Sequence, residues 1–267
     1  MRLLVLGAHP DDAEFHAGGL ITSYLRLGHK VKIVSVTNGA AGHHWRPPLE
    51  LSAVRRAEAD AVAQRYGIDY SVWDFPDGEL QPTLDVRRRI IGEIRTFAPD
   101  LVLTHRTCDY HPDHRAVGLA VQDASYMVTV PPIVAEVPAL RKDPVVAYMN
   151  DLFTKPYPLS PDVVLDITPF VDTIVAMLAC HASQVFEWLP YNSRSEDQLP
   201  DEEGARLNWL GHWYSWRARA VANRFRAALI ATYGPKQGEA VQFAEAYEIS
   251  EYAAAMSDTE RKRLFPS

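Results

Sequence analysis

The feature that most constrains the fold is a set of short apolar runs that recur about every 30 residues, each followed by a helix-like stretch. Each run is closed by turn residues, as expected of a short strand buried in a sheet. The strands predicted in this way are residues 2–7, 31–36, 70–75 and 101–104. Alternation of strand and helix at this spacing is typical of parallel strands joined by right-handed crossovers. The sequence therefore predicts an α/β fold, a Rossmann-like three-layer sandwich with a mostly parallel sheet.

Helices are predicted between these strands because apolar residues recur there at helical spacing, as at Val86, Ile90 and Ile94. Their approximate bounds are residues 15–27, 54–66 and 86–97. Beyond residue 130 the pattern is less regular, and it indicates strands at 145–149 and 163–167 and helices at 169–185 and 202–233. We expect one domain over residues 1–267, with a core at 1–130 and a C-terminal helical and β addition at 131–267.

The composition is that of a globular protein, with 47% apolar and 23% charged residues. The net charge of −7 gives no reason to expect nucleic acid or an anionic membrane as a partner. Two cysteines, Cys108 and Cys180, make no disulfide framework, which fits a reducing compartment. Neither a signal peptide nor an apolar run of about 20 residues is visible, so we expect a cytoplasmic protein. Assembly into a homo-oligomer stays open.

The stretch Ala8–Glu14 places one histidine and three carboxylates directly after the first apolar run. Adjacent acids such as Asp11 and Asp12 repel each other, and burying either costs several kcal/mol unless a cation or hydrogen-bond donors compensate. A divalent metal is the simplest such partner. About a hundred residues later a second stretch supplies a matching group of side chains, namely Asp109, His111, Asp113 and His114.

Both stretches follow predicted strands, the first and the fourth. In a doubly wound sheet these two strands are neighbours where the strand order reverses, and ligands bind beyond their carboxyl ends. The fold and the metal hypothesis rest on different features of the sequence, yet they place one site at one sheet edge. The alternative is that Asp11 and Asp12 only cap a helix and that the histidines pack in the core.

The predicted metal ligands are His9, Asp12 and His114, which would leave a fourth position open for water, as catalytic zinc requires. Nitrogen and oxygen ligands without a thiolate favour Zn²⁺ over magnesium, although iron or cobalt would fit the same geometry. Spacing alone leaves open whether Asp11 or Asp12, and whether His111 or His114, takes the ligand role.

Three further residues are predicted to act in catalysis. Asp11 is adjacent to a ligand yet free to serve as a general base. His111 is placed to stabilise an oxyanion or to protonate a leaving amine. Asp113 could orient one of the histidines by accepting a hydrogen bond from its ring.

Together, residues 8–12 (Ala-His-Pro-Asp-Asp) and 111–114 (His-Pro-Asp-His) resemble the LmbE / PIG-L family of zinc-dependent N-deacetylases. The similarity covers nearly all of residues 3–120. Its other segments are Thr37–Gly39, Arg56–Glu58, Pro76–Gly78 and Pro99–Asp100, with weaker matches at His181–Gln184 and Phe243–Ala246. The chain departs from the family pattern at Phe15 and His16, where a glycine is more usual than His16, and this affects the shape of the pocket wall.

The resemblance implies that His9, Asp12 and His114 bind zinc, that Asp11 is the general base, and that His111 assists the transition state or leaving group. It implies removal of an N-acetyl or other N-acyl group, typically from an amino sugar or glycoside, by attack of a zinc-activated water on a linear amide. The small-molecule N-acetylated substrate is not specified. Two alternatives are a zinc amidase with a non-sugar substrate, such as a thiol conjugate, and a metal-binding module without turnover.

Four residues are candidates for substrate contacts: Arg56, Asp77, His43 and His44. The resemblance places Arg56 and Asp77 near the substrate, although a structural ion pair explains their charges nearly as well. His43 and His44 lie in the loop after the second strand, which opens at the same sheet edge; the alternative is a surface loop without a role. The aromatic cluster at 209–216 is more typical of core packing or a subunit contact than of carbohydrate stacking.

Overall fold

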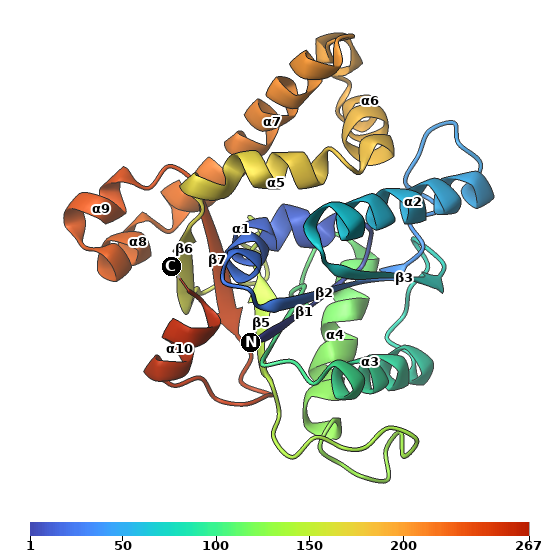
Figure 1. Cartoon of the computed structure of the whole chain (residues 1–267), viewed down its shortest axis with the longest axis vertical. Helices are drawn as coiled ribbons and strands as arrows, with labels where there is room; N and C mark the ends of the chain where they lie inside the picture. The colour runs from blue at the N-terminus through green and yellow to red at the C-terminus, as the bar shows by residue number, and fades with distance from the viewer. Residues whose placement is uncertain (267) are drawn as a thin grey trace.

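A seven-stranded sheet forms the centre of the computed structural model, which describes residues 1–266 (Figure 1). The strands are β1 (Arg2–Gly7), β2 (Lys30–Thr37), β3 (Asp69–Phe75), β4 (Leu101–Thr104), β5 (Val145–Met149), β6 (Val163–Asp166) and β7 (Ala244–Ile249). Their order is β3-β2-β1-β4-β5-β7-β6. Strands β1 to β5 pair in parallel, whereas β7 is antiparallel to both β5 and β6. The mostly parallel sheet confirms the predicted fold class.

Strands β1 and β4 are neighbours, with Leu6 opposite Thr104 in the register. The chain builds β2 and β3 on one side of β1 and then returns to β4 on the other side. The strand order therefore reverses between β1 and β4, as the sequence predicts. The loops that follow these two strands open at the same edge of the sheet.

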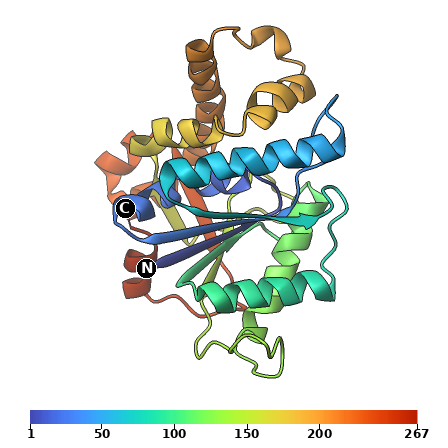
Figure 2. The same ribbon diagram turned by 45° about the vertical axis from the view of Figure 1, so that its right-hand side comes forward.

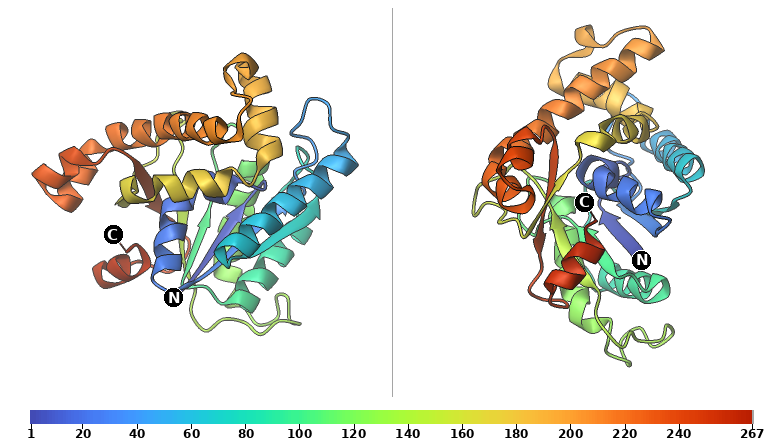
Figure 3. Two further views of the ribbon diagram at one scale, coloured as in Figure 1. Left: turned by 45° about the horizontal axis from the view of Figure 1, so that its top comes forward. Right: turned by 60° about the vertical axis from the view of Figure 1, so that its left-hand side comes forward.

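The helices cover both faces of the sheet. They are α1 (Asp12–Arg26), α2 (Pro48–Tyr66), α3 (Leu84–Phe97), α4 (Pro112–Met127), α5 (Val171–Leu178), α6 (Leu189–Ser193), α7 (Glu203–Arg224), α8 (Arg226–Tyr233), α9 (Pro235–Ala240) and α10 (Asp258–Leu264). Figures 1 and 2 show α1 and α2 on one face and α3 and α4 on the other. Figure 3 shows α5 and α7 stacked outside α1, so that the C-terminal half adds a further layer on that face.

Strand β1 shows why the strands read as unbroken apolar runs. Leu3 and Val5 pack into the core beneath α1 and α5, whereas Leu4 and Leu6 pack into the core beneath α3 and α4. Successive side chains point to opposite faces, and each face is covered by helices, so residues 3–6 are all apolar and all buried.

The C-terminal half differs in detail from the prediction. The single helix expected at 202–233 is two helices, α7 and α8. They are separated at Phe225, whose ψ of 26° is not helical. The helix expected at 169–185 is a short turn, then α5, and then a π-helical segment at Ser183–Trp188. Strand β7 was not predicted, because its sequence contains two glutamates, one of which is buried.

Helix lengths bear on membrane association. Within residues 1–266, no single helix has the length and apolar character needed to cross a membrane. One pair of segments, Thr168–Leu178 and Ser183–Ser193, passes on length and composition together, but the two are bent by 89°.

Candidate metal centre and active site

A cavity of about 600 Å³ opens at the carboxyl edge of β1 and β4. One wall comes from the loops that follow these strands and includes His9, Asp11 and His111. The opposite wall comes from the C-terminal half and includes Trp188 and Trp213. Cavities of this size accommodate small organic ligands.

The structure brings together the three predicted ligands. Asp12 Oδ2 lies 3.5 Å from His9 Nδ1, and Asp12 Oδ1 lies 3.4 Å from His114 Nε2. The rings of His9 and His114 are 5.2 Å apart, centroid to centroid. Local backbone geometry produces this approach, because Asp12 is the first residue of α1 and its Oδ2 accepts a 2.7 Å hydrogen bond from the His9 backbone amide. A Cβ on Gly7 would lie 2.9 Å from the Asp12 Cβ, so glycine is required beside it.

Carboxylates hold the outer nitrogens of both histidines. His9 Nε2 lies 3.1 Å from Asp77 Oδ1 and 3.2 Å from Asp113 Oδ2. His114 Nδ1 lies 3.2 Å from Asp109 Oδ1. The inner nitrogens, His9 Nδ1 and His114 Nε2, are left facing Asp12. Histidines that ligate metals are typically oriented in this way by a carboxylate on the other nitrogen.

The electrostatics of the cluster favour a cation. Burial lowers the pKa of His114, but Asp12 and Asp109 outweigh it and raise the pKa to about 9. Burial likewise opposes the charged form of His9, yet Asp113, Asp12 and Asp77 hold its pKa well above the usual value. The imidazoles retain protons here because carboxylates surround them. A divalent ion can replace those protons, so the donor set fits zinc.

A third histidine, His105, joins this cluster and was not predicted from the sequence. It follows β4 directly, is 2% exposed, and its ring stacks on that of His114 at 3.9 Å. Its Nε2 lies 3.1 Å from Asp12 Oδ2. Three overlapping trios offer ligand atoms within 4.8 Å of one another: His9–His111–His114, Asp12–His105–His114 and His9–Asp77–Asp113. The sequence signal that could have identified His105 is its position directly after the predicted strand at 101–104, beside the site.

Asp11 lies beside the cluster as the N-cap residue of α1, with a positive φ of 108°. Such a backbone conformation is uncommon outside glycine, and it concentrates at functional sites. Asp11 is 3% exposed, and its Oδ2 has no hydrogen-bond partner within the described structure. Burial raises the pKa of Asp11 to about 6; Arg55 lowers it, and Asp12 adds to the rise. An unsatisfied carboxylate that takes up a proton near neutral pH suits a general base.

The arginine beside Asp11 is Arg55, which precedes Arg56, the arginine predicted to contact substrate. Arg55 Nη2 donates to the Pro10 carbonyl at 2.6 Å and lies 3.7 Å from Asp11 Oδ2. Arg56 instead bonds to Asp74 at 2.8 Å, outside the cavity. Arg55 and Arg56 lie on different sides of α2, because successive residues of a helix point in different directions. Substrate contact by Arg56 stays a prediction that its position does not support.

His111 and Asp113 lie in the second loop with different surroundings. His111 borders the cavity, and its ring is 4.6 Å from that of His9. The Asp113 side chain is fully buried and accepts hydrogen bonds from the backbone amides of Gly78 and Leu80 besides contacting His9. Asp113 therefore orients His9 and does not face the cavity.

The remaining predicted substrate contacts are divided. Asp77 lines the cavity, but its oxygens are engaged by His9 and by the Ala41 amide. His43 and His44 do not line it: His43 Nε2 lies 2.9 Å from Glu187, and His44 stacks on Tyr191 at 3.9 Å. They attach their loop to the Ser183–Ser193 segment, and substrate contact by either stays a prediction.

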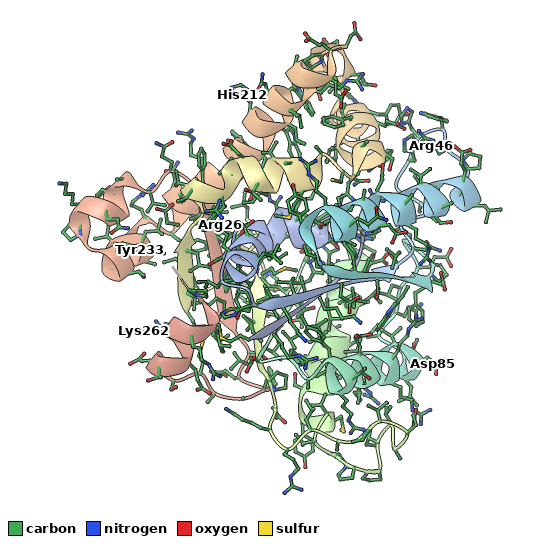
Figure 4. The ribbon with its side chains drawn as sticks, in the orientation of Figure 1. Arg26, Arg46, Asp85, His212, Tyr233 and Lys262 are labelled. Atoms are coloured by element: carbon green, nitrogen blue, oxygen red, sulfur yellow. The ribbon has the colours of Figure 1, made fainter. Side chains whose placement is uncertain are left out.

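The aromatic residues at 209–216 lie on different sides of α7 and differ in their surroundings. Trp213 lines the cavity and meets Phe15 edge to face at 5.5 Å, Tyr214 is buried, and Trp216 is 73% exposed. Figure 4 shows His212 projecting from α7 away from the sheet. Core packing is therefore a role of Tyr214, with Trp209 and Trp213 packed against the same core, and Trp213 also belongs to the cavity wall.

The curated relatives differ in activity, as two of the most similar show. The chain is 26% identical over 212 residues to a diacetylchitobiose deacetylase of Thermococcus kodakarensis, covering 71% of this chain and 74% of the relative. It is 27% identical over 196 residues to a 4-oxalmesaconate hydratase of Pseudomonas putida, covering 70% of this chain and 76% of the relative.

A solved structure shows the same fold over nearly the whole chain. The N,N'-diacetylchitobiose deacetylase of Pyrococcus horikoshii, determined with an inhibitor, superposes with a TM-score of 0.70 at 21% identity, covering 94% of this chain and 84% of that one. Residues 4–125, which contain both acid and histidine loops, match the family described as PIG-L, GlcNAc-PI de-N-acetylase. Residues 4–125 thus form a segment that matches the LmbE / PIG-L family, and the fold of the chain is that of its deacetylase members.

Proposed function

We propose that the protein is a zinc-dependent hydrolase that removes an N-acetyl or related N-acyl group from a small molecule of the amino-sugar class. The observation that carries the proposal is the buried, unsatisfied Asp11 carboxylate beside the His9–Asp12–His114 cluster in one cavity. The match to a family of N-deacetylases supports the reaction type.

In this proposal His9, Asp12 and His114 hold the metal. The ion, when bound, polarises the acyl carbonyl and lowers the pKa of water. Asp11 accepts the proton of the attacking water, for which its raised pKa of about 6 is suited. The same carboxylic acid can then pass a proton to the departing amine, which leaves acetate and a free amine.

His111 has the second proposed role. Its ring borders the cavity next to His9, and its Nδ1 accepts a hydrogen bond from the Asp113 amide at 3.2 Å. An Nδ1 that accepts leaves the hydrogen on Nε2, so the ring presents a donor to the cavity. That donor can stabilise the oxyanion that forms at the acyl carbon or assist the leaving amine.

The test is acetate release from a panel of N-acetylated amino sugars and glycosides by the zinc-loaded protein. We expect turnover that a chelator abolishes and that added zinc restores. Asp12→Ala and His114→Ala should lose both bound zinc and activity, whereas Arg56→Gln should keep both. Zinc binding without turnover on any N-acyl compound, thiol conjugates included, would favour a metal-binding module.

A second candidate is hydration of a carbon–carbon double bond in an unsaturated carboxylic acid. The 27% identical Pseudomonas hydratase favours it, because its match covers as much of the chain as the deacetylase match. The same Asp11 could then serve as the base toward water. Loss of ultraviolet absorbance of unsaturated dicarboxylates, without acetate release from the sugar panel, would favour this candidate.

A further inference from the structure

The far side of the cavity combines residues from the start of α1 with residues from α7. Phe15 and Trp213 pack edge to face, and one turn along α7 Arg217 also lines the cavity. Arg217 Nη2 lies 3.5 Å from His16 Nδ1. This wall therefore presents a guanidinium among aromatic side chains, close to the metal cluster.

Arg217 differs from the other charged residues of the cavity because the described structure gives it no carboxylate partner. Asp11 lies 3.7 Å from Arg55, but its Oδ2 has no hydrogen-bond partner in the described structure. The other cavity carboxylates are engaged by other side chains: Asp12 and Asp77 by His9, Asp109 by His114, and Asp151 by Arg106. In the Arg106–Asp151 ion pair, Arg106 Nη1 donates to both carboxylate oxygens, at 3.1 and 3.0 Å.

His16 does not satisfy Arg217 either. His16 Nδ1 lies 3.0 Å from the Asn150 carbonyl oxygen, which can only accept a hydrogen bond, so Nδ1 must carry the hydrogen. An Nδ1 that donates to a carbonyl cannot also accept from a guanidinium. Arg217 is thus held at the cavity surface with its donors free for a ligand.

We propose that Arg217 binds an anionic group, a carboxylate or a phosphate, on the substrate whose N-acyl group is hydrolysed at the metal. The inference rests on the proposed function. A guanidinium is a planar fork of donors that matches both kinds of anion. The other arginine of the cavity, Arg55, already faces the Asp11 carboxylate and donates to the Pro10 carbonyl, so Arg217 is the feature of this wall that selects a substrate by charge.

The position of Arg217 also limits the size of the substrate. One imidazole, that of His16, separates the guanidinium from the stacked rings of His105 and His114, whose centroids lie 5.7 and 6.5 Å from that of His16. An anion on Arg217 and an amide at the metal therefore belong to one compact molecule. Phe15 and Trp213 contact the apolar surface between the two groups.

The experiment compares kcat/KM for matched N-acetyl compounds that differ in charge. N-Acetylglucosamine is the neutral member, N-acetylmuramic acid carries a carboxylate, and the 1- and 6-phosphates of N-acetylglucosamine carry a phosphate at two positions. We expect at least one anionic member to exceed the neutral one by about tenfold or more, in line with a charge-assisted hydrogen bond.

Arg217→Gln should lower kcat/KM for the anionic member by about ten- to hundredfold and leave the neutral compound within about twofold. Arg217→Lys should restore part of the loss. The matched control is Arg219→Gln, which removes an exposed arginine of the same helix that lies over Phe243 and outside the cavity. This variant should leave kcat/KM unchanged for both the neutral and the anionic compounds.

The possible outcomes distinguish failure of the anion site at Arg217 from failure of the proposed deacetylase activity. Equal loss on neutral and anionic compounds in Arg217→Gln, or no preference for any anion in the wild type, would overturn the inference and leave the deacetylase intact. If no N-acyl compound is turned over, calorimetric titration of the same compounds into the wild type and Arg217→Gln decides. Anion binding that depends on Arg217 would then support the anion site while the proposed reaction fails; binding independent of Arg217 would overturn both.

Discussion

The two walls of the cavity differ in how their charges are satisfied. On the wall formed by the loops after β1 and β4, nearly every charged group has a partner of opposite charge. His9, for example, contacts three carboxylates. On the C-terminal wall, Arg217 stands among aromatic residues without a carboxylate partner in the described structure. The first arrangement fixes side chains in one geometry, and the second leaves binding capacity for a ligand.

This difference assigns different tasks to the two halves of the chain. The parallel strands β1 and β4 place the groups that we propose do the chemistry, and the positions of these groups depend on the sheet and little on the substrate. The C-terminal helices place the groups that would distinguish substrates. Changes on the first wall should therefore affect every substrate equally, whereas changes on the second should depend on the substrate.

The largest effect should come from Asp11→Asn, which removes the proposed base but keeps the shape of the side chain. We expect kcat to fall by about a hundred- to ten-thousandfold on every substrate, neutral or anionic. Zinc content, measured by elemental analysis, should be unchanged because the three ligands are intact. A loss that differs between neutral and anionic compounds would break the division between the two walls.

Glu245 connects the two halves, and its titration should alter stability. It lies on β7, is 2% exposed, and accepts hydrogen bonds from the Gly19 and Leu20 amides of α1 and from Tyr247. Burial raises its pKa from 4.5 to about 7, against the effect of these hydrogen bonds. The folded protein therefore holds a proton that the unfolded chain releases, so stability is lost as the pH rises from about 4.5 through 7.

The expected loss over this range is about 3 kcal/mol, from a shift of about 1.4 kcal/mol per pKa unit. Glu245→Gln mimics the protonated acid and should remove this contribution. Urea unfolding at pH 5 and pH 8 checks it: the variant should match the wild type at the lower pH and exceed it at the higher one. If the free energy of unfolding changed equally with pH in the two proteins, the raised pKa of Glu245 would be contradicted.

The first half of the fold was predictable because its signals are local. Four apolar runs and their helical stripes fall at the positions of β1 to β4 and α1 to α3, and the adjacency of β1 and β4 follows from the general topology of doubly wound sheets. Strand β7 was not predictable from the same signals. Its buried Glu245 is satisfied by α1, more than 200 residues earlier in the chain, and no local pattern contains that contact.

The site divides in the same way. Proximity of His9, Asp12 and His114 could be predicted because their loops follow neighbouring strands. The choice of Arg55 over Arg56 depends on the rotation of α2 against the sheet, which the motif does not encode. Arg217 could not be placed at all, since its approach to His16 requires the packing of α7 outside α1.

Asp113 tests whether the paired charges on the first wall are needed to orient the ligands. Asp113→Asn should weaken zinc binding by about ten- to a hundredfold, because His9 loses one of the carboxylates that hold its Nε2. Competition with a fluorescent chelator measures the affinity. Asp123→Asn, on the same helix in an exposed pair with Arg87, is the control and should leave the affinity unchanged.

The smallest effects compare packing in the two halves through a pair of helical glycines. A Cβ on Gly19 of α1 would lie 2.2 Å from Ile167 Cγ2 and 3.0 Å from Glu245 Oε1, so Gly19→Ala should destabilise the protein by about 1–3 kcal/mol. A Cβ on Gly211 of α7 meets nothing within 4 Å, and Gly211→Ala should stabilise by about 0.5–1 kcal/mol through helix propensity. Urea unfolding measures both. Opposite signs would show that α1 is fixed against the sheet, as a helix carrying Asp12 must be, while α7 keeps an open face; a loss at both positions would mean that α7 is covered along its length.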